Sequence, residues 1–222
     1  MTGRVARAYS VRHMGESARA DAVPALGSLI LAGGLSLRMG RDKAGLLYHG
    51  EPQVRRIARL LERVAPPAYV AARPAQLVDE AFAGLRLLPD REEGIGPLEG
   101  ILSAFREDPA RAWLIVAVDM PFLTEHALRF LVDSRDARGF ATAFRNLEID
   151  GPEPVCAIYE PRMRPVLEDR KKNGRYSLQV LRDLPVRLVD PPSAEELQNI
   201  NYPEEYRQAV DPGAGGDQPA GT

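Results

Sequence analysis

Short apolar runs alternate with amphipathic stretches along this chain, and the alternation limits the folds open to it. The apolar runs, each with the length of a strand, occupy residues 28–32, 68–72, 85–89 and 113–118. Residues 52–65 and 97–107, which lie between these runs, carry their apolar side chains at helical spacing. Such an alternation is typical of a parallel sheet with right-handed crossovers. We therefore predict an α/β fold with a Rossmann-like, doubly wound, mostly parallel sheet that has helices on both faces.

The pattern continues toward the C-terminus and sets the limits of the folded domain. We expect further helices over residues 124–135, 161–170 and 176–184, and further strands over residues 140–144, 155–159 and 186–189. The N-terminal residues contain several arginines but lack the apolar centre of a secretory signal, and the last residues are rich in glycine and proline. We predict a disordered leader over residues 1–27, a single domain over residues 28–210 and a disordered tail over residues 211–222.

Composition and charge exclude several classes of protein. Lysine and arginine total 29 against 31 aspartates and glutamates, and this net charge of −2 argues against a general nucleic-acid-binding protein. Cys156 is the only cysteine, so the chain can form neither an internal disulfide nor a cysteine metal cluster, and we expect a cytoplasmic setting. No apolar run approaches the roughly 18 residues of a membrane-spanning helix, so we expect no membrane contact.

The first apolar run ends at two glycines, which basic residues follow. In "LAGGLSLRMGRDK", residues 31–43, backbone N–H groups around Gly33 and Gly34 can form a concave anion site, to which Arg38 and Lys43 add positive charge. The spacing excludes a Walker A loop, because five residues separate Gly34 from the next glycine, and the dinucleotide-binding pattern Gly-x-Gly-x-x-Gly is absent. We interpret the segment as a third type of phosphate-binding loop. The alternative is a glycine turn with solvated basic side chains.

Asp119 directly follows the apolar run at 113–118 and is the strongest candidate for a metal ligand. Ligands of such sheets bind at the carboxyl ends of the strands, where both Asp119 and the glycine-rich loop are expected. Mg²⁺ is commonly bound by one or two carboxylates together with substrate phosphates. The alternative interpretation of Asp119 is a turn residue that caps a loop.

The string "LAGGLSLRMGRDK" resembles the signature of the molybdenum cofactor guanylyltransferases, which belong to the nucleotidyltransferase superfamily. Further segments that are similar to this family, in order along the chain, are "GIGPLEGI" (94–101), "VAVDMPFL" (116–123), "PVCAIY" (154–159) and "NINYPEEY" (199–206). The resemblance covers roughly residues 28–206. It implies a fold of the nucleotide-diphospho-sugar transferase type.

The resemblance also implies a reaction. Enzymes of this family transfer GMP from GTP to the terminal phosphate of molybdopterin with Mg²⁺, form molybdopterin guanine dinucleotide and release pyrophosphate. GTP and molybdopterin would be the substrates, and contact with molybdenum cofactor insertion or delivery proteins stays open. Two alternatives also stay open: a related nucleotidyltransferase that uses CTP or a sugar or polyol phosphate acceptor, and a nucleotide-binding regulatory domain without activity.

Residue roles follow from the same resemblance. It implies catalytic roles for Lys43 and Arg38, which would neutralise phosphate charge, and for Asp119, which would bind the metal. Asp90 would accept hydrogen bonds from guanine, although a surface turn aspartate is nearly as good an interpretation. The full set of implied nucleotide contacts is Leu31, Ala32, Gly33, Gly34, Lys43, Asp90, Gly96, Pro97, Leu98 and Asp119.

Two further features concern the rim of this expected site. Asn199 and Asn201 lie two residues apart, so their side chains face the same side of an extended segment, and they could reach the acceptor phosphate. The alternative for Asn201 is a helix N-cap. Glu99 is larger and more acidic than the small residue that the resemblance leads us to expect beside the base.

Overall fold

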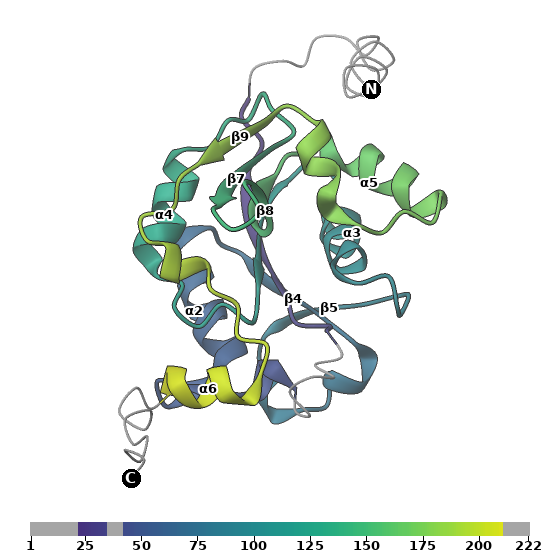
Figure 1. Cartoon of the computed structure of the whole chain (residues 1–222). Coiled ribbons are helices and arrows are strands. Elements are labelled where there is room, and N and C mark those ends of the chain that lie inside the picture. Colours follow the sequence, from purple (N-terminus) through teal and green to yellow (C-terminus); the bar gives the residue numbers. More distant parts are fainter. Residues whose placement is uncertain (1–21, 35–41, 211–222) are drawn as a thin grey trace.

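The computed structural model describes residues 22–34 and 42–210. These residues form a central sheet that has helices on both faces (Figure 1). Within these residues a seven-stranded sheet has the strand order β5-β4-β1-β6-β8-β7-β9. The strands are β1 (Leu26–Leu31), β4 (Ala68–Ala72), β5 (Arg86–Pro89), β6 (Ala112–Ala117), β7 (Ala141–Asn146), β8 (Gly151–Tyr159) and β9 (Val186–Val189).

Most neighbouring strands are parallel, as the sequence predicted. β1 runs parallel to β4 and β6, β4 to β5, and β7 to β9. β8 is antiparallel to both of its neighbours, β6 and β7. Every residue of β6 is buried, because helices cover both faces of the sheet at its centre.

The helices divide between the two faces. Their bounds are α2 (Gln53–Val64), α3 (Pro97–Glu107), α4 (Glu125–Asp133), α5 (Met163–Lys172) and α6 (Pro203–Val210). Side chains of α2 and α4 pack with Ile30 of β1, whereas side chains of α3 and α5 pack with Leu29 of the same strand. Because successive strand residues point to opposite faces, one strand serves two apolar layers. This arrangement confirms the predicted doubly wound fold.

Short elements complete the described chain. They are the 3-10 helices η1 (Lys43–Gly45), η2 (Pro74–Gln76), η3 (Glu80–Phe82), η4 (Leu178–Asp183) and η5 (Ala194–Leu197), and a hairpin of β2 (Leu47–Tyr48) and β3 (Glu51–Pro52). None of the helices in the described part of the chain has the length and apolar content needed to cross a bilayer.

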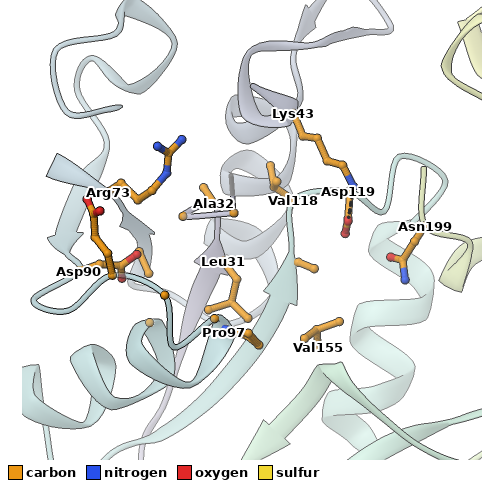
Figure 2. A pocket seen from close by; sticks show the side chains of 18 of the residues that line it. Leu31, Ala32, Lys43, Arg73, Asp90, Pro97, Val118, Asp119, Val155 and Asn199 are labelled. Atoms are coloured by element: carbon orange, nitrogen blue, oxygen red, sulfur yellow. Dashed lines mark hydrogen bonds and ion pairs between the residues drawn. The ribbon is translucent and has the colours of Figure 1, made fainter. Parts of the chain in front are cut away.

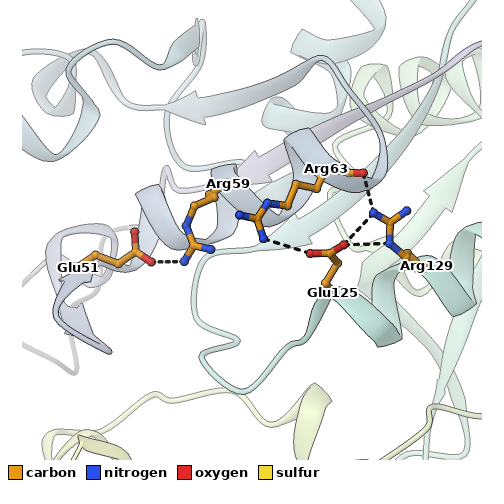
Figure 3. A network of polar contacts seen from close by, with 5 residues as sticks. All are labelled: Glu51, Arg59, Arg63, Glu125 and Arg129. Atoms are coloured by element: carbon orange, nitrogen blue, oxygen red, sulfur yellow. Dashed lines mark hydrogen bonds and ion pairs between the residues drawn. The ribbon is translucent and has the colours of Figure 1, made fainter.

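An ion-pair network joins α2 to α4 at the surface (Figure 3). The Arg63 guanidinium lies 3.4 Å from the Glu125 carboxylate, which also accepts a 2.7 Å hydrogen bond from Arg129. Arg129 in turn donates to the carbonyl of Arg63, and Arg59 pairs with Glu51. Exposed pairs of this kind add little stability, because water and salt screen them. The buried apolar contacts between α2 and α4 therefore hold this face together.

The structure differs from the sequence-based expectations at a few element boundaries. β1 begins at Leu26, two residues before the predicted start of the domain. The helix expected at 176–184 is the 3-10 helix η4, which begins after the N-cap Ser177. β8 starts at Gly151 rather than at 155. Its pairing with β7 shifts register between Ala143 and Arg145 and then continues to Gly151, and the sequence pattern does not reveal this continuation. Most of the predicted leader and all of the predicted tail lie outside the described residues.

The strand order reverses between β1 and β6. From β1 the chain moves outward through β4 to β5, and it then returns to place β6 on the other side of β1. In open α/β sheets, ligands bind in the crevice outside the carboxyl ends of the strands at such a reversal. Residues 32–34 after β1 and residues 118–119 after β6 meet at this point.

Candidate functional site

A pocket of about 840 Å³ opens at the point where the strand order reverses. Its wall is formed by residues at and after the carboxyl ends of β1, β4, β5 and β6, together with Lys43 of η1, the first turn of α3, Val155 of β8 and the segment that precedes α6. Figure 2 shows Lys43, Asp119 and Asn199 toward one end of the pocket and Arg73 and Asp90 toward the other. The polar groups at the two ends are different.

Lys43 and Asp119 form the centre of the first end. The Lys43 ammonium lies 2.8 Å from Asp119 Oδ2 and 2.7 Å from Asn201 Oδ1. The Lys43 side chain is 14% exposed and the Asp119 side chain 23%, so both groups face the pocket while most of their surface is covered. At such a partly buried site the cation can neutralise phosphate charge, and the carboxylate can serve as a ligand to a metal ion.

Local structure brings these side chains together. Lys43 begins η1, and the N-cap Asp42 accepts a 3.0 Å hydrogen bond from the backbone N–H of Ala44. On the other side, the backbone N–H of Ile200 donates to the carbonyl of Asp119 at 2.9 Å, so the segment 199–201 lies along the residues that follow β6. Glu205 of α6 accepts a 2.7 Å hydrogen bond from the backbone N–H of Asn201. Asn199 and Asn201 of this segment both line the pocket.

Asp90 dominates the second end of the pocket. In the described part of the chain, its buried Oδ1 atom has no hydrogen-bond partner. Burial raises the pKa of Asp90 to about 6, and the carboxylate of Glu99 adds to the rise. A Cβ atom at Gly33 would lie 2.3 Å from Asp90 Oδ2, so glycine is needed at this position for the close approach of Asp90. Asp90 is thus an acceptor that is held against the glycine-rich segment.

The turn before α3 closes the same end. Gly96 has φ 65° and ψ −149°, a conformation that is open almost only to glycine, and Pro97 follows as the first residue of the helix. Glu99 does not point into the pocket. Its side chain is 1% exposed and accepts hydrogen bonds from Arg106 at 2.5 Å and Lys171 at 2.7 Å. Arg106 and Lys171 therefore neutralise the charge of Glu99, and the side chain does not line the pocket.

Most of the residues predicted for the site line this one pocket. Those that do are Leu31, Ala32, Gly33, Gly34, Lys43, Asp90, Gly96, Pro97, Asp119, Asn199 and Asn201. The side chain of Leu98 does not line the pocket, because it packs in the core beneath α3 and is 1% exposed. Arg38 lies outside the described residues.

Sequence reasoning missed Arg73, which lines the pocket beside Asp90. Arg73 directly follows β4, and its guanidinium lies 3.5 Å from Asp42 Oδ2. Its position after a strand at the carboxyl edge of the sheet was the available signal.

The donor groups at the first end suit Mg²⁺ that is shared with a substrate. Among the described residues, no group of three or more His, Cys, Asp or Glu side chains could hold a metal by itself. Asp119 offers a carboxylate, and Asn199 Oδ1 is buried without a hydrogen-bond partner in the described part of the chain. Mg²⁺ takes hard oxygen ligands and often draws most of them from phosphates and water. Asp119 with substrate phosphates therefore fits this ion, whereas a site built from protein ligands alone does not.

Comparison with known proteins gives a consistent set of relatives. Residues 28–188 match the family described as the MobA-like NTP transferase domain. A molybdenum cofactor guanylyltransferase of Pseudomonas putida is 32% identical over 189 residues, which cover 83% of this chain and 97% of the relative. A molybdenum cofactor biosynthesis bifunctional protein of Synechocystis is 32% identical over 181 residues, and the match spans 81% of this chain but only 52% of that longer protein.

A solved structure supports the fold. The crystal structure of molybdopterin-guanine dinucleotide biosynthesis protein A from Archaeoglobus fulgidus is similar to this chain with a TM-score of 0.69. The two share 21% sequence identity, and the match covers 83% of this chain and 97% of that one. At this identity the likeness concerns the fold, and it agrees with the doubly wound sheet described above.

Proposed function

Since this chain belongs to the family of MobA-like NTP transferases, we propose that it transfers GMP from GTP to the terminal phosphate of molybdopterin. The products would be molybdopterin guanine dinucleotide and pyrophosphate. The relative in Pseudomonas putida, which is matched over nearly its whole length, bears the name of this activity.

The observation that carries the proposal is the division of polar groups along one pocket. The cation of Lys43 and the carboxylate of Asp119 stand at one end, where a triphosphate and its metal would lie. The acceptor Asp90 stands at the other end, next to the close-packed Gly33 and the turn at Gly96. Guanine presents N–H donors at N1 and N2, and a carboxylate can accept from both. The pocket thus offers partners for both parts of GTP.

The chemistry needs little more than positioning and charge neutralisation. An oxygen of the acceptor phosphate attacks the α-phosphorus of GTP, the bond between this phosphorus and the oxygen that bridges to the β-phosphate breaks, and pyrophosphate leaves with the electron pair. The second pKa of a phosphate monoester is about 6, so the acceptor is largely ionised at neutral pH and needs no side-chain base. The obstacle is repulsion between two anions. Lys43 and the backbone N–H groups near Gly33 and Gly34 would reduce it.

Asp119 would hold Mg²⁺ at the same end of the pocket. When bound, the ion supplies positive charge to the phosphate oxygens and helps to fix the geometry of the displacement. Asn199 and Asn201 would stand on the acceptor side, because they approach Asp119 from the C-terminal segment. Asn201 also accepts a hydrogen bond from Lys43, so it orients this cation toward the pocket.

A nucleotide panel tests the proposed base preference. GTP with Mg²⁺ at about 100 times its Kd should raise the melting temperature by roughly 5 to 10 °C, and CTP, UTP and ATP should raise it less. The same panel, with molybdenum-loaded molybdopterin as acceptor, should give pyrophosphate release with GTP. Equal melting shifts from all four nucleotides would refute the guanine assignment, and turnover with CTP alone would favour cytidylyl transfer.

Asp90 should make GTP binding depend on pH. Only the ionised carboxylate accepts hydrogen bonds from both guanine N–H groups. The pKa of Asp90 is raised to about 6, so the side chain should take up a proton as the pH falls through this value. Below it, the affinity for GTP should decrease by about tenfold per pH unit. Calorimetric titration between pH 5 and 8 with Asp90→Asn as the control checks this, because the titration of GTP itself is common to both proteins. Identical pH profiles would remove Asp90 from base recognition.

A further inference from the structure

Gln76, the last residue of η2, is a buried polar residue that the proposed reaction does not use. It is 4% exposed and does not line the pocket. Its side-chain amide contacts two chain segments that are distant in the sequence and the backbone at the start of its own helix. A buried amide that satisfies its donors and its acceptor in this way fixes the relative positions of its partners.

Two of the three contacts involve the residues on either side of the sequence 33–41. Gln76 Nε2 donates to the carbonyl of Ala32 at 3.0 Å and to Asp42 Oδ2 at 2.5 Å. Gln76 Oε1 accepts from the backbone N–H of Arg73 at 2.9 Å. Ala32 directly precedes Gly33, and Asp42 directly precedes Lys43. One side chain therefore joins the two residues that flank the sequence 33–41.

Asp42 connects Gln76 to Lys43. While Asp42 Oδ2 accepts from Gln76, Asp42 Oδ1 caps the first turn of η1, which begins at Lys43. Lys43 then extends from this turn to Asp119. A displacement of Asp42 would shift the start of η1 and would change where the Lys43 ammonium lies in the pocket.

We propose that Gln76 is a positioning residue for the triphosphate end of the site. It fixes the separation between the backbone at Ala32–Gly34 and the turn that carries Lys43, so that both contact the same polyphosphate. It acts through Asp42 and touches no substrate. The inference rests on the proposed function, because its main readout is nucleotide binding and transfer.

Gln76→Glu is the single substitution that tests these hydrogen bonds most directly. It replaces the donor Nε2 with an oxygen between two acceptors, the Ala32 carbonyl and the Asp42 carboxylate, and it adds like charge beside Asp42. The kcat/KM for GTP should fall roughly 10- to 100-fold, while the KM for the molybdopterin acceptor should change by no more than about twofold. Gln179→Glu, on an exposed residue of η4, is the matched control and should leave both constants unchanged. Gln76→Met, which removes the amide without adding charge, should lower kcat/KM for GTP as well and replaces Gln76→Glu if that variant does not fold.

A reciprocal exchange separates positioning from packing. In the double variant Gln76→Glu with Asp42→Asn, the amide at position 42 can donate to the carboxylate at position 76, and the net charge returns to that of the unchanged protein. The kcat/KM for GTP should recover by about fivefold or more over Gln76→Glu alone, although the Ala32 carbonyl remains without its donor. No loss in Gln76→Met and Gln76→Glu, or no recovery in the double variant, would overturn the inference. A failure of the unchanged protein to bind GTP would instead overturn the proposed function, and the inference with it.

Discussion

Replacing Asp119 with alanine should reduce turnover by about 10³-fold or more, because a metal and its carboxylate ligand contribute several kcal/mol to the stabilisation of transition-state charge. The fold should survive the change. The carboxylate is partly exposed at the end of β6 and faces the pocket, so its removal leaves no cavity in the core. Steady-state pyrophosphate release measures the effect, and a thermal melt confirms that the variant is folded.

Asp119→Asn separates two roles that the structure allows for this residue. An asparagine oxygen can still accept the hydrogen bond from Lys43, but it lacks the charge that Mg²⁺ requires. If Asp119 holds the metal, the asparagine variant should be nearly as inactive as the alanine variant, and its turnover should not saturate with Mg²⁺ at concentrations where we expect the unchanged protein to saturate. Asp133→Asn on the exposed end of α4 provides the matched control. Near-normal turnover of Asp119→Asn would show that the residue only orients Lys43.

Lys43→Ala should weaken GTP binding by about 1.5 to 3 kcal/mol, the contribution of a charged hydrogen bond, which corresponds to a loss of roughly 10- to 150-fold in affinity. The loss in kcat/KM should be larger than the loss in affinity, because negative charge increases on the leaving pyrophosphate in the transition state. Calorimetric titration with GTP and steady-state kinetics give the two quantities.

The control for this variant is Arg187→Ala, which removes one positive charge from an exposed position on β9. It should leave affinity unchanged and so correct for the change in net charge of the molecule. Lys43 also pairs with Asp119 and Asn201, so a melt should accompany the titration. An unchanged GTP affinity in Lys43→Ala would show that the cation serves the fold and not the ligand.

The fold and the place of the site could be predicted from local patterns. The run "SLILA" is apolar on both faces because β1 lies between two helical layers, and this periodicity is visible without tertiary information. The same holds for the position of Asp119, because a polar residue at the carboxyl end of a buried strand has a defined location in a doubly wound sheet. The spacing of Asn199 and Asn201 predicts that their side chains share one side of an extended segment and could reach the site, and both residues line the pocket.

Contacts between distant segments could not be predicted in this way. Gln76 lies in a short 3-10 helix with no distinctive pattern, and its importance depends on partners 34 and 44 residues away. The orientation of the Glu99 side chain depends on its ion pairs with Arg106 of the same helix and Lys171 of α5. Leu98 was assigned to the nucleotide because its neighbours resemble a motif, but its own position on α3 faces the core. Tertiary packing decides which residues of a motif reach the ligand.

The order in which the site is built along the chain has a consequence for biosynthesis. The matched family region ends at residue 188 and the last strand of the sheet at Val189, yet Asn201 supplies one of the groups that hold Lys43. A nascent chain can therefore form its whole sheet on the ribosome before the lysine has this amide partner. A polypeptide released between Val189 and Asn199 would contain every strand of the sheet but would lack the two asparagines that border Asp119, and it would also lose the buried side chain of Ile200.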